Sequence, residues 1–534
     1  MINMKLSFIP SLLLLVVSTN LLFVCGFVPS LPWMGSTTTI TTARIDDSIE
    51  GFTLRSTRER RKRARPIDPE YWPERYPAKD LCSKCGLCET TFVTEVKNAC
   101  AFLGPGMARI DDLEEGVHGR RRDAESLRES FSPDTVDEAR FGVLHEPVRL
   151  AKGNRIEGAQ WTGVVTGIAI SMLEAGEVDA VVCIANDESG DSGDGAGHFG
   201  SPEPILARTA ADVLRGRGVK PALAPSLRVL DEIENDESIQ RLLFCGVGCA
   251  VQAFRAVQDE LGLKEVYVLG TNCADNSPTP QAARNFVRDG VQVADIEDVQ
   301  GYEFMQDFKV HVKSKESYVR KPYFTLPGTI AEASIAKSCR ACFDYTNALA
   351  DVVVGYMGAP LEEGGSETSR MDQSFQTLTV RNERGAHMVG VARKASRLVV
   401  GEPAGGEGSH EKLASATVAS DAIVNAMIGK PVPEEGMPGW LGQIMAFGMR
   451  RMGPKGMNFA RYSIDYHILR NYLFVLNTKG SEEKAMMALP QNAREIVNYY
   501  LENDKEFEAI HSKIRAANGM GIEGGQSKIR AAGP

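Results

Sequence analysis

The chain has 534 residues, a hydrophobic content of 43%, a charged content of 24% and a formal net charge of -10. These values are ordinary for a globular protein with two or three domains and a large core. The acidic balance excludes a general nucleic-acid binder, which would be basic, so we expect no nucleic-acid partner.

The first 66 residues have the pattern of a targeting region. After Lys5, an apolar stretch runs from Leu6 to Val28 and ends near small residues that suit cleavage, as in a secretory signal peptide. A Ser/Thr-rich run at 36–42 and a basic run at 55–65 follow. Together they resemble the bipartite presequence of plastids in algae of the secondary red lineage, so we predict a presequence over 1–66 and a location in the plastid stroma. An uncleaved membrane anchor is the alternative, because the apolar stretch is long enough to span a bilayer.

A group of four cysteines follows the presequence. Its members are Cys82, Cys85, Cys88 and Cys100. Thiols at two-residue spacing are poor disulfide partners, whereas this spacing places thiolates around an iron–sulfur cluster. We therefore predict a small N-terminal iron–sulfur region over 70–140, with a charged, loop-rich stretch over 111–138. Zinc is the alternative, because four thiolates also suit a tetrahedral zinc ion.

Residues 141–395 alternate between apolar strands and helices. Helices are predicted over 163–173 and 252–261, and strands over 180–184, 241–246, 266–270, 302–312 and 351–356. This alternation favours an α/β core with a mixed or parallel sheet. Gly195 to Gly200 matches the dinucleotide-binding pattern G-x-G-x-x-G, but no helix pattern follows it. We interpret that stretch as a flexible insertion, because the motif must join a strand to a helix.

The remainder of the chain is predicted to be a linker, a helical extension and a tail. Residues 396–480 begin with a Gly- and Pro-rich linker, and two helices follow it near 439–451 and 463–476. Residues 481–534 form a charged, helix-prone tail that we expect to be disordered from Asn518. The apolar segment from Trp440 to Phe447 is predicted to be a core helix, with contact at the thylakoid membrane surface as the alternative.

A second cysteine group is spread over the α/β core. Its members are Cys249, Cys273, Cys339 and Cys342. Cys249 and Cys273 each follow the end of a predicted parallel strand, where open α/β sheets bind ligands. Cys339 and Cys342 form a C-x-x-C pair, which alone is also typical of a redox dithiol. We predict a second cluster on these four thiols, and Cys245 is an alternative ligand to Cys249.

Two clusters imply a cofactor that exchanges single electrons for pairs, and flavin is the usual one. Three glycine-containing turns and one arginine are the candidate flavin contacts, although ordinary turns and a solvated arginine are the alternatives. The candidates are Gln160, Trp161, Thr162 and Gly163 at a helix start, Gly246 and Gly248, Gly355 and Met357, and Arg381. A helix start has free amides that can hold a phosphate.

Four stretches of the chain resemble a known family. They are Glu157–Gly163, Phe244–Cys249, Cys339–Tyr345 and Val354–Gly358. They look like the beta subunit of deazaflavin-dependent hydrogenases, and more closely like the plastid and cyanobacterial branch of that family. The resemblance runs from Tyr76 to Val475. It implies FAD, two 4Fe–4S clusters, reduced ferredoxin as the electron donor, and a chlorophyll or chlorophyllide substrate.

The branch includes two reductases of chlorophyll side chains. We expect 8-vinyl reduction of divinyl chlorophyllide, because red-lineage algae mostly lack chlorophyll b and have little need to recycle 7-hydroxymethyl chlorophyll a. Reduction of 7-hydroxymethyl chlorophyll a is the alternative. A non-catalytic electron-relay subunit and a zinc-stabilised binding protein are further alternatives, and a homo-oligomer is compatible with all of them.

The candidate proton donors lie beside the flavin motifs in the sequence. Glu157, Asp344 and Tyr345 are the candidates, because burial raises the pKa of a carboxyl and lets it donate near neutral pH. A structural hydrogen-bonding role is the alternative for each. His118 or His145 is a candidate ligand of the substrate magnesium. Three arginines, Arg120 to Arg122, are a candidate docking site for acidic ferredoxin.

Overall fold

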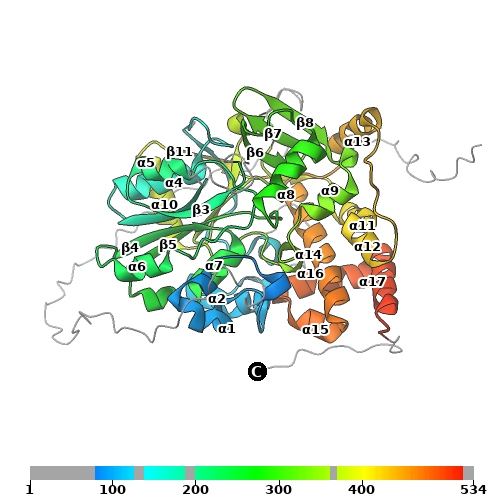
Figure 1. The fold of residues 1–534 in the computed structure, drawn as a ribbon, viewed down its shortest axis with the longest axis horizontal. Coiled ribbons are helices and arrows are strands. Elements are labelled where there is room, and N and C mark those ends of the chain that lie inside the picture. The colour runs from blue at the N-terminus through cyan, green and yellow to red at the C-terminus, as the bar shows by residue number, and fades with distance from the viewer. Residues whose placement is uncertain (1–77, 125–136, 155, 187–198, 361–369, 521–534) are drawn as a thin grey trace, which may run out of the picture. The chain divides into compact units, whose positions relative to one another are not determined.

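The computed structural model describes residues 78–124, 137–154, 156–186, 199–360 and 370–520, all within the unit that runs from Glu59 to Pro534 (Figure 1). The predicted presequence and Gly195 to His198 lie outside the described residues. Among those that are described, no helix is long and apolar enough to cross a membrane.

An eight-stranded sheet forms the centre of the fold, in the order β11-β1-β10-β9-β5-β4-β2-β3. The strands are β1 (Arg149–Gly153), β2 (Ala180–Asn186), β3 (Pro202–Ala207), β4 (Arg241–Gly246), β5 (Glu265–Thr271), β9 (Val352–Gly355), β10 (Gln376–Val380) and β11 (Leu398–Pro403). The four strands β9, β5, β4 and β2 run parallel. The others pair antiparallel, so the predicted mixed α/β sheet is confirmed.

The central strands are covered on both faces, which is why they are almost entirely apolar. Along β4, Leu242 and Phe244 belong to one core and Leu243 to another, as the alternation of a strand requires. Helices α4 (Val164–Glu174) and α10 (Glu383–Lys394) pack together on the Leu243 side. Helix α7 (Gly248–Arg255) and the C-terminal helices contribute to the core on the other side.

A second sheet stands apart from the first. It consists of the antiparallel strands β6 (Val299–Phe304), β7 (Lys309–Ser314) and β8 (Tyr318–Pro322). The stretch 302–312, predicted as part of the α/β core, therefore forms parts of two strands of this separate sheet. Val310 and Val312 pack against Phe286 and Val287 in a small core of their own, which fixes this hairpin away from the main sheet.

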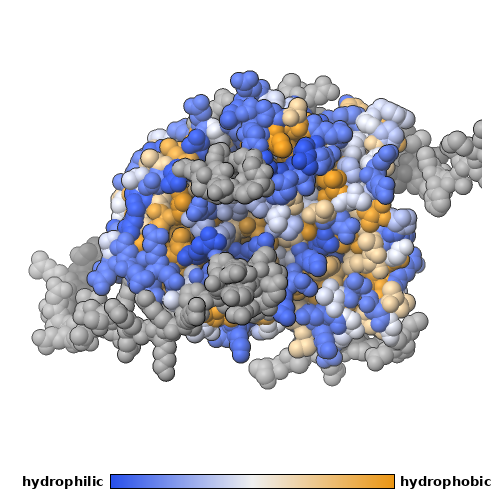
Figure 2. Space-filling model, viewed as in Figure 1, coloured by the Kyte–Doolittle hydropathy of each residue, from blue (hydrophilic) through white to orange (hydrophobic). Residues whose placement is uncertain are grey.

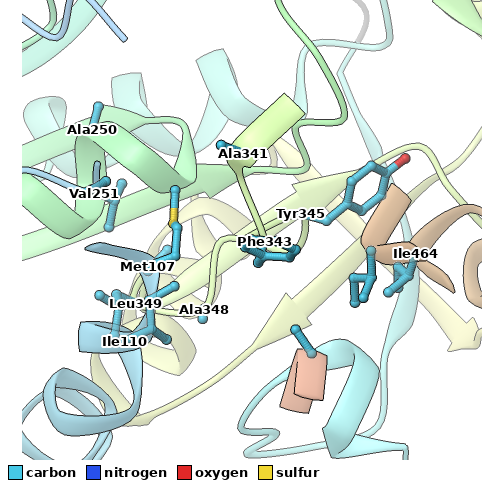
Figure 3. Packing of buried hydrophobic residues seen from close by; sticks show 14 of the residues in the cluster. Met107, Ile110, Ala250, Val251, Ala341, Phe343, Tyr345, Ala348, Leu349 and Ile464 are labelled. Carbon is cyan, nitrogen blue, oxygen red and sulfur yellow. The ribbon is translucent and has the colours of Figure 1, made fainter. Parts of the chain in front are cut away.

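The N-terminal cysteine segment is made of short helical turns. They are η2 (Lys79–Leu81), η3 (Leu87–Glu89), η4 (Thr91–Glu95), α1 (Val96–Ala99) and η5 (Gly106–Arg109). A regular helix, α2 (Ile110–His118), replaces part of the loop predicted over 111–138, because acidic residues start it and Gly119 ends it in the left-handed region. Met107 and Ile110 are buried in the core with Val251 and Leu349, which joins this segment to α7 (Figure 3).

The C-terminal third is helical almost throughout. Its helices are α11 (Glu411–Ser420), α12 (Ala422–Met427), α13 (Gly439–Met452), α14 (Met457–Lys479), α15 (Glu482–Met487), α16 (Gln491–Asn503) and α17 (Lys505–Ala517). The linker prediction is wrong where α11 and α12 form, since Asp421 caps α12 and α11 packs on α14. Tyr500 and Phe507 are fully buried, so the predicted tail belongs to the core up to α17. Residues from 521 lie outside the described part.

Candidate functional site

A cavity of about 600 Å³ lies at the carboxyl ends of the parallel strands. Gly246 ends β4, Thr271 ends β5 and Gly355 ends β9, and all three line the cavity. Open α/β sheets bind ligands at this edge. The volume and the largely apolar wall suit a bound organic cofactor together with part of a substrate.

Two helices begin at the cavity wall. Gly163, in the left-handed region, precedes α4, and neither α4 nor α7 has a side-chain cap at its N-terminus. Gly248 starts α7, and a Cβ atom there would lie 2.5 Å from Asp344 Oδ2, so only glycine fits. Uncapped helix N-termini present free N–H groups, which suit the diphosphate of a dinucleotide cofactor.

The first cysteine group is gathered by a tight turn. Gly86 adopts a φ of 89°, and a Cβ atom there would lie 2.9 Å from the backbone N of Arg228. The N–H of Leu227 donates to the Cys85 carbonyl at 2.7 Å, which fixes this turn against the segment before α6 (Leu230–Asn235). The four thiols are near neighbours, and Cys82 and Cys100 each lie close to both Cys85 and Cys88. The pKa of the Cys88 thiol is raised to about 12. Burial is the main cause, and the neighbouring thiols are the next.

The second cysteine group also converges. Its thiols are near neighbours in the cavity wall: Cys249, Cys273, Cys339 and Cys342. Burial is the main cause that raises the pKa of the Cys339 thiol to about 12. Cys245 also lines the cavity, but its thiol interacts with Cys183 and not with this group, so Cys249 is the member of the group.

The two groups lie side by side. Cys249 interacts with Cys100 and with Ser83, and Cys85 interacts with Cys249. Cys85 is also the member of the first group that reaches the cavity. The two groups and the cavity are therefore in direct contact with one another.

Helix α14 holds the loops of the second group in place. Asn471 Nδ2 donates to the carbonyls of Cys339 and Cys342, at 2.9 and 2.7 Å. Arg470 forms a bidentate ion pair with Asp275, at 2.9 and 3.0 Å, just beyond Cys273. Sequence reasoning missed both residues. Their signal was two adjacent large polar side chains that interrupt the apolar run of the predicted helix, between Leu469 and Leu473.

The donor atoms fit iron–sulfur clusters. All ten cysteines in the described ranges are free thiols. Backbone N–H groups donate to sulfur in both groups, from Lys84 to Cys82 at 3.3 Å and from Asn276 to Cys339 at 3.3 Å. Such bonds are a feature of cluster ligands. Within the described residues, no group of three or more His, Cys, Asp or Glu side chains is placed to hold a single metal ion.

Most of the predicted flavin contacts line the cavity: Gln160, Trp161, Gly163, Gly246, Gly248 and Gly355. Trp161 also stacks on Tyr356, with ring centroids 6.3 Å apart. The structure places three others elsewhere. Thr162 accepts a hydrogen bond from the N–H of Gly153, and Met357 is buried outside the cavity.

Arg381 is the third predicted contact that lies away from the cavity. It is buried, and its guanidinium donates to the carbonyls of Phe141, Val143 and Thr346 at 2.6–2.9 Å. These bonds tie the segment after α3 (Glu138–Phe141) to the loop after Tyr345. Arg381 is therefore placed as a structural residue and not as a phosphate partner.

The three predicted proton donors have different surroundings. Glu157 is exposed and does not line the cavity. Asp344 and Tyr345 do line it. Burial raises the pKa of Asp344, whose Oδ1 accepts from the N–H of Ala348 at 2.8 Å. Burial also raises the pKa of Tyr345, whose hydroxyl lies 2.9 Å from Ser463 Oγ.

A fourth acid, Glu303 on β6, was missed by sequence reasoning. Its carboxyl faces the cavity, and Gln160 Nε2 lies 3.4 Å from its Oε2. Trp161 and Tyr356 also hydrogen-bond to it. Burial outweighs these donors and raises the pKa of Glu303 to about 8. The available signal was one acid between the aromatic residues Tyr302 and Phe304 in a strand.

The remaining candidates lie outside the cavity. His118 Nε2 lies 2.8 Å from the carbonyl of Ala348, and burial lowers the pKa of His118 to about 4. His145 is exposed, away from the cavity wall. Arg120 pairs with Glu138, and Arg122 pairs with Glu114. This run is therefore largely occupied within the chain and does not present three free cations to a partner.

Comparison with known proteins assigns the family. Models described as the N-terminal and C-terminal parts of the coenzyme F420 hydrogenase/dehydrogenase beta subunit match residues 148–231 and 239–405. A rice protein named 7-hydroxymethyl chlorophyll a reductase, chloroplastic, is 44% identical over 82% of this chain and 85% of its own length. The chain belongs to the family of the coenzyme F420 hydrogenase/dehydrogenase beta subunit.

Two further relatives show how far the family extends. An uncharacterised protein of Nostoc sp. (strain PCC 7120) is 38% identical over 82% of this chain and 97% of its own length. A component of the F(420)H(2) dehydrogenase of Methanosarcina mazei is 28% identical over 53% of this chain and 77% of its own length. The resemblance to a hydrogenase beta subunit that the sequence motifs indicated is confirmed.

Proposed function

We propose that this chain is a plastid oxidoreductase that reduces a side chain of chlorophyll, with reduced ferredoxin as the electron donor. The observation that carries the proposal is a pair of adjacent four-cysteine groups that opens onto one large cavity. The identity to a chloroplastic chlorophyll reductase of rice supports both the substrate class and the plastid location.

The rice relative favours the 7-hydroxymethyl group as the reacting side chain. In that reaction a hydroxymethyl group, two electrons and two protons give a methyl group and water. Reduction of an 8-vinyl group also takes two electrons and two protons, and gives an ethyl group. The cavity described above serves either reaction, so 8-vinyl reduction remains a prediction that only a product assay can separate.

The cofactors we propose are one FAD and two 4Fe–4S clusters. The two cysteine groups would hold the clusters, and the N-termini of α4 and α7 would hold the FAD diphosphate. When bound, this set converts single electrons into pairs. The stacked rings of Trp161 and Tyr356 form an aromatic wall against which a flat ring system can lie.

The chain's own residues supply a proton and exclude water from the cavity. We assign the proton to the carboxyl of Glu303, because burial keeps it protonated at neutral pH. Gln160 orients that carboxyl by its amide. Apolar side chains from distant parts of the chain, among them Phe304 and Phe459, line the same cavity and exclude water around the reacting group.

Turnover by the purified chain tests this function. Protein prepared without oxygen is given reduced ferredoxin and either 7-hydroxymethyl chlorophyll a or divinyl chlorophyllide, and the pigments are separated by chromatography. We expect conversion of one pigment, and the product identifies the reaction. Failure to convert either pigment, with electrons still accepted from ferredoxin, would favour the electron-relay role that the Methanosarcina mazei relative suggests.

A further inference from the structure

The exposed hydrophobic side chains of the described residues are concentrated in one place. Of the ten large hydrophobic side chains that are exposed, six lie between Met437 and Met452: Met437, Trp440, Ile444, Met445, Phe447 and Met452. The face seen in Figure 2 carries hydrophobic residues in several places among hydrophilic ones. A local concentration of this kind marks an interaction surface.

These residues form an outward stripe on α13. Trp440, Ile444 and Phe447 recur at helical spacing, so they share one face, and 58–69% of the area of each side chain is exposed. The opposite face is already used. Gly442 and Ala446 are buried there, and α13 packs on η9 (Tyr323–Thr325) and β8. The outward stripe is therefore not the face by which α13 packs on η9 and β8.

Cations border the stripe at its C-terminal end. Arg450 and Arg451 lie in the last turn of α13, and the guanidinium of Arg451 lies 4.6 Å from the Phe447 ring centroid. Lys455 is exposed just beyond, and α13 itself contains no acidic residue; the nearest in sequence, Glu434 and Glu435, precede it. A chain of net charge -10 thus presents a positive, aromatic edge here. Such an edge suits anionic lipid headgroups over an apolar interior.

The stripe is also connected to the cavity. The inner face of α13 rests on η9, whose Tyr323 lines the cavity. Phe304 lines the cavity too, is 38% exposed, and has its ring 5.1 Å from that of Tyr323. Aromatic side chains therefore run from beneath α13 into the proposed substrate site. An apolar ligand held in a bilayer would meet this side of the molecule first.

We propose that α13 is an interfacial anchor that lies in the surface of an anionic bilayer and presents the cavity to apolar pigment held there. The second half of this inference rests on the proposed function; the first half does not. A second copy of the chain is a poorer occupant. The outward side chains offer on the order of 500 Å², below the roughly 800 Å² per partner of a stable protein interface.

Vesicle co-sedimentation tests the anchor without any turnover. The full chain is mixed with vesicles of phosphatidylcholine alone or with phosphatidylglycerol added. We expect binding to the anionic vesicles that weakens as salt is added. The triple variant W440S/I444S/F447S should bind at least about tenfold more weakly. R450Q/R451Q should also bind more weakly and lose most of the salt dependence.

Matched controls separate the stripe from general hydrophobicity. Met487 and Val399 are similarly exposed apolar residues that lie outside α13, after it and before it in the sequence. M487S and V399S should bind vesicles like the unchanged chain, and unchanged thermal unfolding should show that the triple variant folds. The anchor is overturned if the unchanged chain does not bind, if the triple variant binds equally well, or if the stripe instead mediates a concentration-dependent dimer.

Turnover then tests the link to the cavity. The triple variant should keep its rate on pigment dispersed in detergent and lose at least about tenfold on pigment embedded in vesicles. Equal loss on both forms would overturn the proposed route from the bilayer. Absence of turnover in every variant, including the unchanged chain, would count against the proposed function while leaving vesicle binding as an independent result.

Discussion

Glu303 combines the properties that a buried proton donor needs. It faces the cavity, it has an amide and an indole as neighbours, and no cation is among the causes that shift its pKa. Asp344 is also buried, but it lies beside the second cysteine group and accepts from Ala348, which suits a role in holding that loop. Glu303 on β6 is therefore the residue that we propose as the proton donor.

Glu303→Gln tests this assignment. Because burial raises the pKa of Glu303 to about 8, the carboxyl is protonated below that pH and ionised above it. Turnover of the unchanged chain should therefore persist at neutral pH and fall as pH rises through about 8. The variant should turn over about 100-fold more slowly and lose that pH dependence. Glu316→Gln, at an exposed site, is the matched control; an unaltered profile in E303Q would contradict the assignment.

Asn471 is expected to matter for the second cysteine group. Asn471→Ala would remove the side-chain donor that the carbonyls of Cys339 and Cys342 share, at a cost of about 1–3 kcal/mol in the free energy of unfolding. Asn503→Ala removes a comparable but exposed bond to the Tyr499 carbonyl and should cost little. Chemical denaturation measures both. Equal stability of the two variants would mean that α14 does not clamp this loop.

Single elements were predicted best where the pattern is local. The strands β2, β4 and β5 and the helix α4 were predicted because continuous apolar runs and small-residue helices are visible within ten residues. The placement of β6 and β7 in a separate sheet was not predicted. Either sheet could accept this hairpin, and only contacts such as that of Val310 with Phe286 decide which sheet it joins. Helices α11 and α12 were missed because glycine and proline dominate the surrounding sequence.

The start of α7 offers a test at the scale of one element. Gly248→Ala would place a Cβ atom 2.5 Å from the Asp344 carboxylate, so the turn must shift, at a cost of about 1–3 kcal/mol. Gly390→Ala in α10 meets no heavy atom within 4 Å and should stabilise by about 0.5–1 kcal/mol. Thermal unfolding of the two variants should therefore move in opposite directions. A shift in the same direction would show that Gly248 is not held closely.

At the scale of the whole molecule, the site is assembled from distant parts of the chain. Cys85 and Asn471 are almost four hundred residues apart in the sequence. Cys85 belongs to the first cysteine group, and Asn471 holds the loop of the adjacent second group. The eight candidate ligand cysteines could be predicted from spacing and resemblance. Glu303, Arg470 and Asn471 could not, because nothing local shows that a strand of the second sheet and a C-terminal helix close the cavity.

The C-terminal helices are expected to be part of one cooperative core. Phe507→Ala on α17 removes a fully buried ring and should cost about 3–5 kcal/mol in the free energy of unfolding. Met487→Ala, on the exposed face of α15, should change it by less than about 0.5 kcal/mol. Denaturant titration compares them. A small effect of F507A would indicate that this region is a dispensable tail.

Iron and acid-labile sulfide per chain test the central claim most directly. Protein purified without oxygen should contain about eight of each, and about four in Cys85→Ser or in Cys342→Ser. Cys183→Ser, which alters a cavity thiol outside both groups, should leave about eight. Zinc in place of iron, or an iron content that neither ligand variant changes, would contradict the account.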